Sequence, residues 1–241
     1  MASRARIEEE AEMLVPIPAP AWAGVALRYR TRPRPKRAFH TVLDAADLLV
    51  EPSTTEVRLD RQADGGVVLE VHVPLKGGFI DDRVEHGPGL AVKRLERKVS
   101  DASGATSRHE IVDFASSTHA LPPCTYVEVS APFLLGAQPF DGNRRSLYAW
   151  ICDRFVAKVY YEMRGTDYVT VPAGRIKAHE VIMYPDLNDY VKLPSIITKL
   201  SKPFLPKYHM WYEVEPPHKL VFFEGPYGPP GAPEIMLELM Q

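Results

Sequence analysis

Ionisable and apolar side chains share strand faces in two consecutive stretches of this sequence, and these faces are the best candidates for chemistry. Tyr161 lies two residues before Met163, and His179 is spaced by twos from Val181 and Met183. On a β-strand, residues two apart point to the same side. An imidazole among apolar neighbours could act as a general base, because its unperturbed pKa lies near neutral pH. We therefore predict His179 and Tyr161 as catalytic residues.

Aromatic side chains on other expected strands would extend this face into an apolar wall. Tyr29 is two residues from Leu27, and Tyr212 is two residues from Met210, so each ring would lie among apolar neighbours. Such a wall suits an aromatic or otherwise apolar ligand with a few polar groups, although core packing is the ordinary role of these rings. The predicted substrate-binding residues are Tyr29, Tyr212, Trp211, Met163, Met183 and Phe222.

Cationic side chains could complete this chemistry by stabilising an oxyanion as it develops. Arg94, Arg97 and Arg175 are the candidates, but the sequence does not fix which strand faces they occupy. With His179 as base, a phenol or a guanidinium would stabilise negative charge on a substrate oxygen. These residue types favour proton transfer without a cofactor.

Four potential metal ligands fall together in the segment GGFIDDRVEHGPG, namely Asp81, Asp82, Glu85 and His86. A hard cation would need several of their oxygens to converge on one point. Because glycines bound the segment on both sides, we interpret it as a solvated hairpin tip and predict no metal. No two of the eight histidines are four residues apart, which agrees with this prediction.

The motifs of common cofactor and nucleophile sites are missing from the sequence. It has no GxGxxG or GxxxxGK[ST] phosphate loop, no GxSxG elbow and no HExxH zinc motif, so we predict no cofactor. Its cysteines, Cys124 and Cys152, lack CxxC spacing. We interpret them as buried thiols and not as a disulfide or a metal-binding pair.

Period-two alternation marks the elements that must position these residues. Residues 67–74 alternate in this way after an Asp-Gly-Gly turn at 64–66. About ten such stretches with short turns predict a mainly β, antiparallel, closed or half-closed lipocalin-like barrel around an apolar cavity, with residues 1–241 as one domain. Further stretches begin near Trp22, Ala91, Arg108, Tyr126, Val156, Arg175, Tyr208, His218 and Pro233.

Helices are expected in few places. Residues 1–21 predict an N-terminal helix and a proline-rich strap, and residues 41–49 predict a short helix with a Thr41 and Asp44 capping box. Residues 187–207 interrupt the last strands, and an insertion of this length is typical of a cap. The segment 146–158 fits a strand and a helix equally well, and both remain open.

The order of features in the C-terminal half resembles a bacterial family, domain of unknown function 3108. The similarity lies in a Val-Pro-Ala-Gly turn at 171–174, a strand centred on Trp211 and a closing strand at 222–224. The resemblance covers about half of the chain. It implies a lipocalin-like curled sheet and supplies no catalytic residue.

The net charge and the N-terminal residues indicate which partners and which cellular location to expect. Lys and Arg total 29 against 31 for Asp and Glu, a formal net charge of −2, which gives no positive field for nucleic acid. The N-terminal residues 1–14 are charged where a signal peptide needs an apolar stretch, so we expect a cytoplasmic protein without a membrane partner. The oligomeric state stays open, with a homodimer as one option.

Two functions from different classes fit these observations. The first is a cofactor-independent lyase or isomerase that acts on an apolar or aromatic oxygenated substrate by elimination or retro-aldol cleavage. The second is a non-catalytic binding or carrier protein for such a hydrophobic small molecule. Buried titratable groups that converge on one point would favour catalysis, whereas a smooth apolar bowl would favour carriage. A structural or partner-binding domain is a third option.

Overall fold

The structure of the chain is a computed structural model. It describes residues 20–34, 45–116, 121–122, 124–152, 155–186, 207–227 and 233–240. The expected N-terminal helix, the capping box of the 41–49 helix and nearly all of the expected cap at 187–207 therefore lie outside the described residues.

The described residues form one large, mainly antiparallel β-sheet, which confirms the predicted fold class. Its strand order is β6-β5-β4-β3-β2-β1-β13-β12-β11-β10-β9-β8-β7, and the sole parallel pair in this part of the chain is β7 with β8. The strands are β1 (Ala26–Pro33), β2 (Ser53–Arg61), β3 (Val67–Leu75), β4 (Gly78–His86), β5 (Val92–Asp101), β6 (Thr106–Asp113), β7 (Thr125–Val127), β8 (Arg145–Cys152), β9 (Phe155–Val171), β10 (Gly174–Pro185), β11 (Tyr208–Glu213), β12 (Leu220–Pro226) and β13 (Glu234–Leu239).

Short helices complete the described elements. They are α2 (Ala45–Leu48), α3 (Ala131–Leu134), and the 3-10 turns η1 (Pro88–Leu90) and η2 (Leu135–Ala137). Residues 45–48 of the expected helix at 41–49 are thus helical. The described residues of the ambiguous segment at 146–158 are extended, since they form most of β8 and the start of β9.

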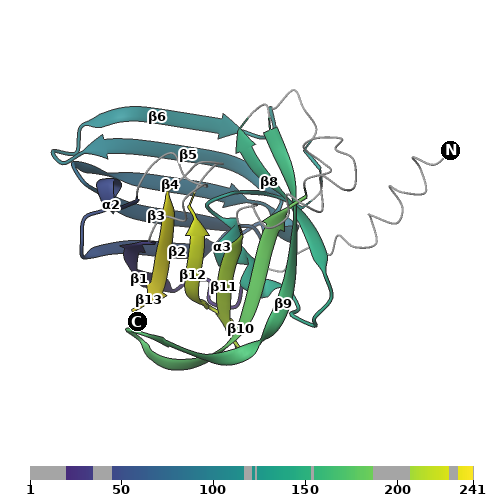
Figure 1. The fold of residues 1–241 in the computed structure, drawn as a ribbon. Coiled ribbons are helices and arrows are strands. Elements are labelled where there is room, and N and C mark those ends of the chain that lie inside the picture. Colours follow the sequence, from purple (N-terminus) through teal and green to yellow (C-terminus); the bar gives the residue numbers. More distant parts are fainter. Residues whose placement is uncertain are drawn as a thin grey trace, which may run out of the picture.

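The sheet curls strongly but does not close. Figure 1 shows the β3–β6 half running across the top of the molecule and the β9–β13 half standing beneath it. The ends of the sheet, β6 and β7, do not pair with each other. Side chains bridge this seam instead: Arg97 of β5 pairs with Glu128 after β7, and the Phe114 ring meets the Trp150 ring edge-on at 5.1 Å.

A hydrophobic core fills the inside of the curl. Strand alternation turns one face inward, as for Leu27 and Tyr29 on β1 and for Leu69 and Val71 on β3, all at most 2% exposed. The two walls of the sheet face each other across this core, so the curl buries apolar side chains from both.

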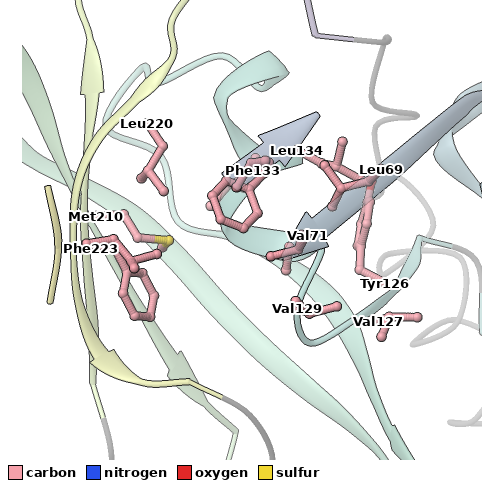
Figure 2. Packing of buried hydrophobic residues seen from close by; sticks show 14 of the residues in the cluster. Leu69, Val71, Tyr126, Val127, Val129, Phe133, Leu134, Met210, Leu220 and Phe223 are labelled. Carbon is pink, nitrogen blue, oxygen red and sulfur yellow. The ribbon is translucent and has the colours of Figure 1, made fainter. Parts of the chain in front are cut away.

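The segment after β7 occupies the interior where the sequence predicted an open apolar cavity. Every residue of α3 is buried, and Figure 2 shows Phe133 between the labelled side chains of β3 and those of β11 and β12. The Phe133 ring lies 5.7 Å from the Tyr29 ring. The side chains of α3 therefore fill the curl at this level. Close packing of such an interior leaves few voids.

The segment that we interpreted as a hairpin tip is a strand, so that interpretation is wrong. Its residues form β4, paired with β3 and β5 along its whole length. Because side chains alternate along a strand, Asp82 and His86 are buried while Asp81 and Glu85 are partly exposed on the opposite face. The four potential ligands therefore do not converge. Among the described residues, no group of three or more His, Cys, Asp or Glu side chains could hold a metal ion.

Candidate functional site

His179 lies on the inner side of β10 but near the rim of the curl. It is half-buried, its Nδ1 lies 2.8 Å from the Thr166 hydroxyl, and its ring lies 6.0 Å from the Phe140 ring. Its pKa is lowered, first by partial burial and then by the charges of His218 and Lys177. None of these neighbours is Tyr161, so the structure does not bring the two predicted catalytic residues into one site.

Tyr161 lies deeper, on β9, and is 4% exposed. Its cross-strand partners are Arg145 on β8 and Met183 on β10. Burial raises its pKa, and the charge of Arg145 opposes that shift. The phenol is therefore protonated at neutral pH and stands ready to donate a hydrogen bond.

Tyr29 and Tyr212 are core side chains with satisfied hydroxyls. The Tyr29 hydroxyl donates to the Leu220 carbonyl at 3.0 Å, and the Tyr212 hydroxyl donates to the Pro132 carbonyl at 2.6 Å. The Tyr212 bond ties the interior segment to β11, and the Tyr29 bond joins β1 to β12. The proton of each hydroxyl is therefore already engaged within the protein.

The remaining predicted binding residues divide between the two faces of the sheet. Met183 is buried and Met163 is half-buried on the inner face. Trp211 and Phe222 pair across β11 and β12 with their rings 5.0 Å apart, on the face opposite the buried Tyr212 and Phe223. We therefore correct their assignment to the cavity wall, since alternation turns them outward.

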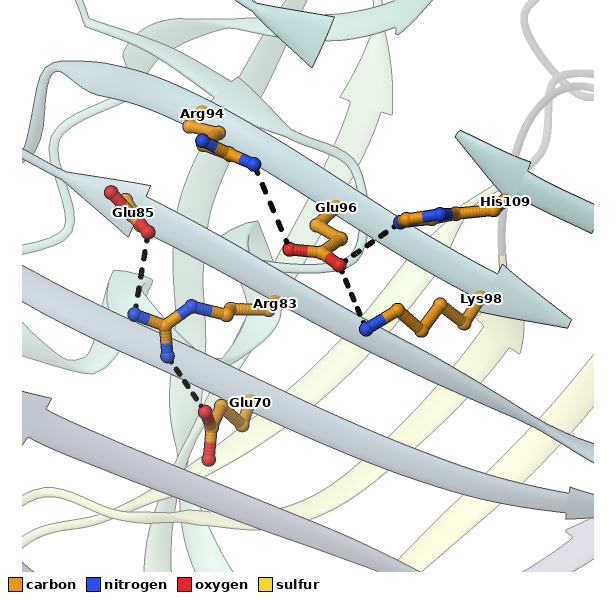
Figure 3. Close-up of polar contacts among 7 residues, drawn as sticks. All are labelled: Glu70, Arg83, Glu85, Arg94, Glu96, Lys98 and His109. Carbon is orange, nitrogen blue, oxygen red and sulfur yellow. Dashed lines mark hydrogen bonds and ion pairs between the residues drawn. The ribbon is translucent and has the colours of Figure 1, made fainter. Parts of the chain in front are cut away.

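A hollow of about 580 Å³ lies over β1–β5, among charged side chains. Glu70 pairs with Arg83 at 2.8 Å, and Glu96 pairs with Lys98 at 2.8 Å, as Figure 3 shows. The other charged groups of the lining are also paired, so the hollow offers no unpaired charge within the described residues. Further pairs are Arg28–Glu56, Arg58–Asp60, His72–Asp81 and Arg97–Asp82. We interpret this face as a solvated charged surface.

Polar atoms without partners gather inside the curl, around Tyr126. The Tyr126 side chain is fully buried, and its hydroxyl has no hydrogen-bond partner among the described residues. Tyr126 pairs with Ala149 of β8, which places it beside the inner face that carries Arg145 and, on the next strand, Tyr161. Burial raises the pKa of Tyr126, and the neighbouring Cys124 and Tyr161 raise it further.

His86 supplies an unpartnered atom close to the Tyr126 ring, and Arg145 supplies another beside Tyr161, its partner on the neighbouring strand. Arg145 binds Asp141 through Nη2 at 2.7 Å, but its buried Nε has no partner in the described structure. The His86 ring lies 6.1 Å from the Tyr126 ring. Its Nδ1 lies 3.0 Å from the Leu90 carbonyl, so Nδ1 carries the proton and Nε2 is a buried acceptor without a partner.

We call His86, Cys124, Tyr126, Arg145 and Tyr161 the Tyr126 cluster. Its unpartnered atoms are one acceptor, His86 Nε2, one donor, Arg145 Nε, and the Tyr126 hydroxyl, which can do both. Burial lowers the pKa of His86 to about 4, and burial raises the pKa of the Cys124 thiol. The cluster is therefore electrically neutral apart from Arg145, whose partner Asp141 has a pKa lowered to about 2 by hydrogen bonds from Asn143 and Arg145.

Sequence reasoning found Tyr161 but missed the rest of this cluster. His86 was assigned to a hairpin tip. A strand was predicted to begin near Tyr126, but β7 has only three residues, too few to indicate which of them face inward. The three cationic candidates also separate: Arg97 points inward to Asp82, Arg94 pairs with Glu96 on the outer face, and Arg175 lies over the Tyr168 ring.

Comparison with known proteins gives similarity of fold alone. No protein-family model and no curated protein matches the chain. Similar solved structures include a β-barrel-like protein of domain of unknown function 1849 from Brucella abortus, with a TM-score of 0.47 and 9% identity over 89% of this chain and 94% of that one. The predicted resemblance thus holds only at a coarser level, a barrel-like domain of unknown function, and family 3108 itself is not matched.

Two further similar structures bear on location. One is a protein assigned as exported, with a YmcC-like fold, from Bacteroides fragilis (TM-score 0.31, 12% identity, 93% of this chain and 98% of that one). The other is assigned as a lipoprotein, from Parabacteroides distasonis (TM-score 0.30, 10% identity, 93% and 98%). Against these neighbours the predicted cytoplasmic location is wrong, and we withdraw it. Within the described ranges, no helix is long and apolar enough to cross a membrane.

Proposed function

We propose that this protein is a non-catalytic binding protein for an apolar small molecule that carries oxygen. The observation that carries the proposal is the set of three buried, unpartnered polar atoms in the Tyr126 cluster. Buried polar atoms in folded proteins are nearly always hydrogen-bonded, and leaving one unpaired costs about 1 to 3 kcal/mol. A ligand oxygen that satisfied these atoms would recover that free energy.

The residue types of the cluster define the ligand's polar group. Arg145 Nε and the Tyr126 hydroxyl can donate to an oxygen, and His86 Nε2 can accept from a hydroxyl. Apolar side chains surround them, since Leu69 and Val127 are fully buried beside Tyr126 (Figure 2). An aromatic or aliphatic molecule with a hydroxyl or a carbonyl oxygen matches this combination.

The same residues argue against catalysis, the function that sequence reasoning placed first. A general base works best with a pKa near the operating pH, and His86 has a pKa of about 4. The two phenols and the Cys124 thiol all have raised pKa values, so none of them is a ready nucleophile or base. The resemblance to family 3108 remains part of this proposal, because that family supplies a curled sheet and no catalytic residue.

Calorimetric titration of the full chain with matched probes tests the proposal. β-Naphthol offers an apolar body with a hydroxyl, and naphthalene offers the same body without it. We expect β-naphthol to bind about tenfold more tightly, because two hydrogen bonds contribute roughly 0.5 to 1.5 kcal/mol each. Tyr126→Phe should remove most of that difference, whereas Tyr168→Phe, at an exposed ring, should keep it.

Two outcomes would overturn the proposal. Equal affinity for β-naphthol and naphthalene would mean that ordered water satisfies the unpartnered atoms. Release of benzaldehyde from its aldol adduct with acetone, above the uncatalysed rate and lost in Tyr126→Phe, would instead establish an enzyme.

A further inference from the structure

A second group of buried polar side chains lies at the seam of the sheet, and we call it the seam cluster: Asp82, Arg97, Glu128 and Tyr227. Arg97 binds Asp82 through Nε at 2.6 Å and Nη2 at 3.0 Å, and reaches Glu128 Oε1 through Nη2 at 3.2 Å. The Asp82 and Glu128 side chains are 4% and 7% exposed. One guanidinium thus joins two buried carboxylates across the unpaired ends of the sheet.

The seam cluster has a surplus of negative charge. Two carboxylates share one guanidinium, so the group carries one net negative charge when both are ionised. Burial raises the pKa of Asp82 and of Glu128, and the Arg97 charge opposes both shifts. Asp81 and Glu110 add further negative charge near Asp82. A buried surplus charge is costly, so the cluster calls for a positive group or a proton.

Two oxygen atoms in the seam cluster stand without partners. Glu128 Oε2 is buried and has no hydrogen-bond partner among the described residues, and the same is true of the Tyr227 hydroxyl. Burial raises the pKa of Tyr227, followed by the charge of Asp82, while Arg97 lowers it, so the phenol lies within the field of the cluster. A carboxylate oxygen and a phenol oxygen are both acceptors for N–H groups.

We propose that the seam cluster binds the protonated amine of a ligand, with N–H donors directed to Glu128 Oε2 and to the Tyr227 hydroxyl. Charge-assisted bonds of this kind are stronger than neutral ones, and a buried carboxylate gains most from them. The inference rests on the proposed function, because Glu128 follows Tyr126 by two residues and a single ligand would meet both clusters. The ligand class is then an apolar amine that also carries an oxygen.

A third probe extends the titration of the full chain near neutral pH. Naphthylmethylamine has the apolar body of naphthalene with a cationic amine and no oxygen. We expect it to bind at least about tenfold more tightly than naphthalene, the lower end for a hydrogen bond to a charged group. Glu128→Gln should lower the affinity for naphthylmethylamine at least about tenfold more than it lowers the affinity for β-naphthol. Glu85→Gln, at a partly exposed carboxylate, should not.

The outcomes distinguish a failure of this inference from a failure of the proposed function. In two cases a proton neutralises the cluster, and the inference fails while the proposed function stands. In both, β-naphthol still binds more tightly than naphthalene. In the first, the amine binds no better than naphthalene, and in the second it binds equally to wild type and Glu128→Gln. If β-naphthol has no advantage, the proposed function fails. Should Glu128→Gln not fold, Tyr227→Phe removes only the hydroxyl, and an unchanged amine affinity in that variant overturns the inference.

Discussion

Tyr212 donates its hydroxyl hydrogen bond to the carbonyl of Pro132 at 2.6 Å, which joins β11 to an interior segment 80 residues earlier in the chain. Gly136, in the following 3-10 turn, packs so closely that an added Cβ would lie 2.4 Å from the His218 carbonyl oxygen. These contacts seat α3 inside the curl. The segment is therefore part of the core, and the fold depends on it.

Removing this hydroxyl should destabilise the protein without changing the fold. In Tyr212→Phe the Pro132 carbonyl loses its donor in a buried site, so we expect the free energy of unfolding to fall by about 1 to 3 kcal/mol. Urea denaturation measures the change. Tyr168→Phe, at a ring that is 53% exposed, is the matched control and should stay within about 0.5 kcal/mol of wild type. An equal change in the free energy of unfolding in both variants would contradict the packing of α3 inside the curl.

Two arginines on neighbouring strands should differ sharply in their contribution to stability. Arg97→Met would leave Asp82 and Glu128 buried without a cation, and breaking such a buried pair costs about 3 to 5 kcal/mol. Arg83→Met breaks pairs with Glu70 and Glu85, whose side chains are 46% and 36% exposed (Figure 3), and should cost about 0 to 1 kcal/mol. Chemical denaturation of both variants tests this; similar losses would contradict a buried seam cluster.

The contrast between these arginines shows what the sequence can predict. Alternation predicted the strands and the inner face of β9 and β10, because period-two patterning is local. It did not predict that β4 is a strand, since its glycines and acidic residues are typical of a turn. Asp82 is tolerated on an inner face because Arg97 lies directly opposite on β5. That pairing depends on the register of two strands, which no local pattern contains.

The interior was harder to predict for a similar reason. A four-residue helix such as α3 has no apolar period of its own, so nothing in its sequence indicates that it turns inward. The Tyr126 cluster likewise assembles His86 of β4 with Tyr126 of β7 across the seam. Sequence reasoning located Tyr161 from its own strand, whereas its neighbours come from strands distant in the chain.

Stability should depend on pH through His86. Its folded pKa is about 4 against 6.5 for the unfolded residue, so between these values only the unfolded chain binds the proton. The contribution of His86 to the free energy of unfolding is therefore fully present above about pH 6.5. It falls by about 3 kcal/mol as the pH decreases toward 4. Comparing wild type with His86→Asn by urea denaturation at several pH values isolates the effect, because other groups titrate in both. Equal losses in the two proteins would show that His86 is not buried in its neutral form.

The last prediction separates the site proposed from the sequence from the site found in the structure. His179 bonds to Thr166 near the rim, so His179→Gln should leave β-naphthol affinity within about twofold of wild type. Tyr126→Phe removes a hydroxyl proposed to bind the ligand oxygen and should weaken β-naphthol about threefold to tenfold, the equivalent of one hydrogen bond. Thermal unfolding of both variants controls for general destabilisation. If His179→Gln weakens binding and Tyr126→Phe does not, the ligand lies at the rim near Phe140, and the Tyr126 cluster is not the site.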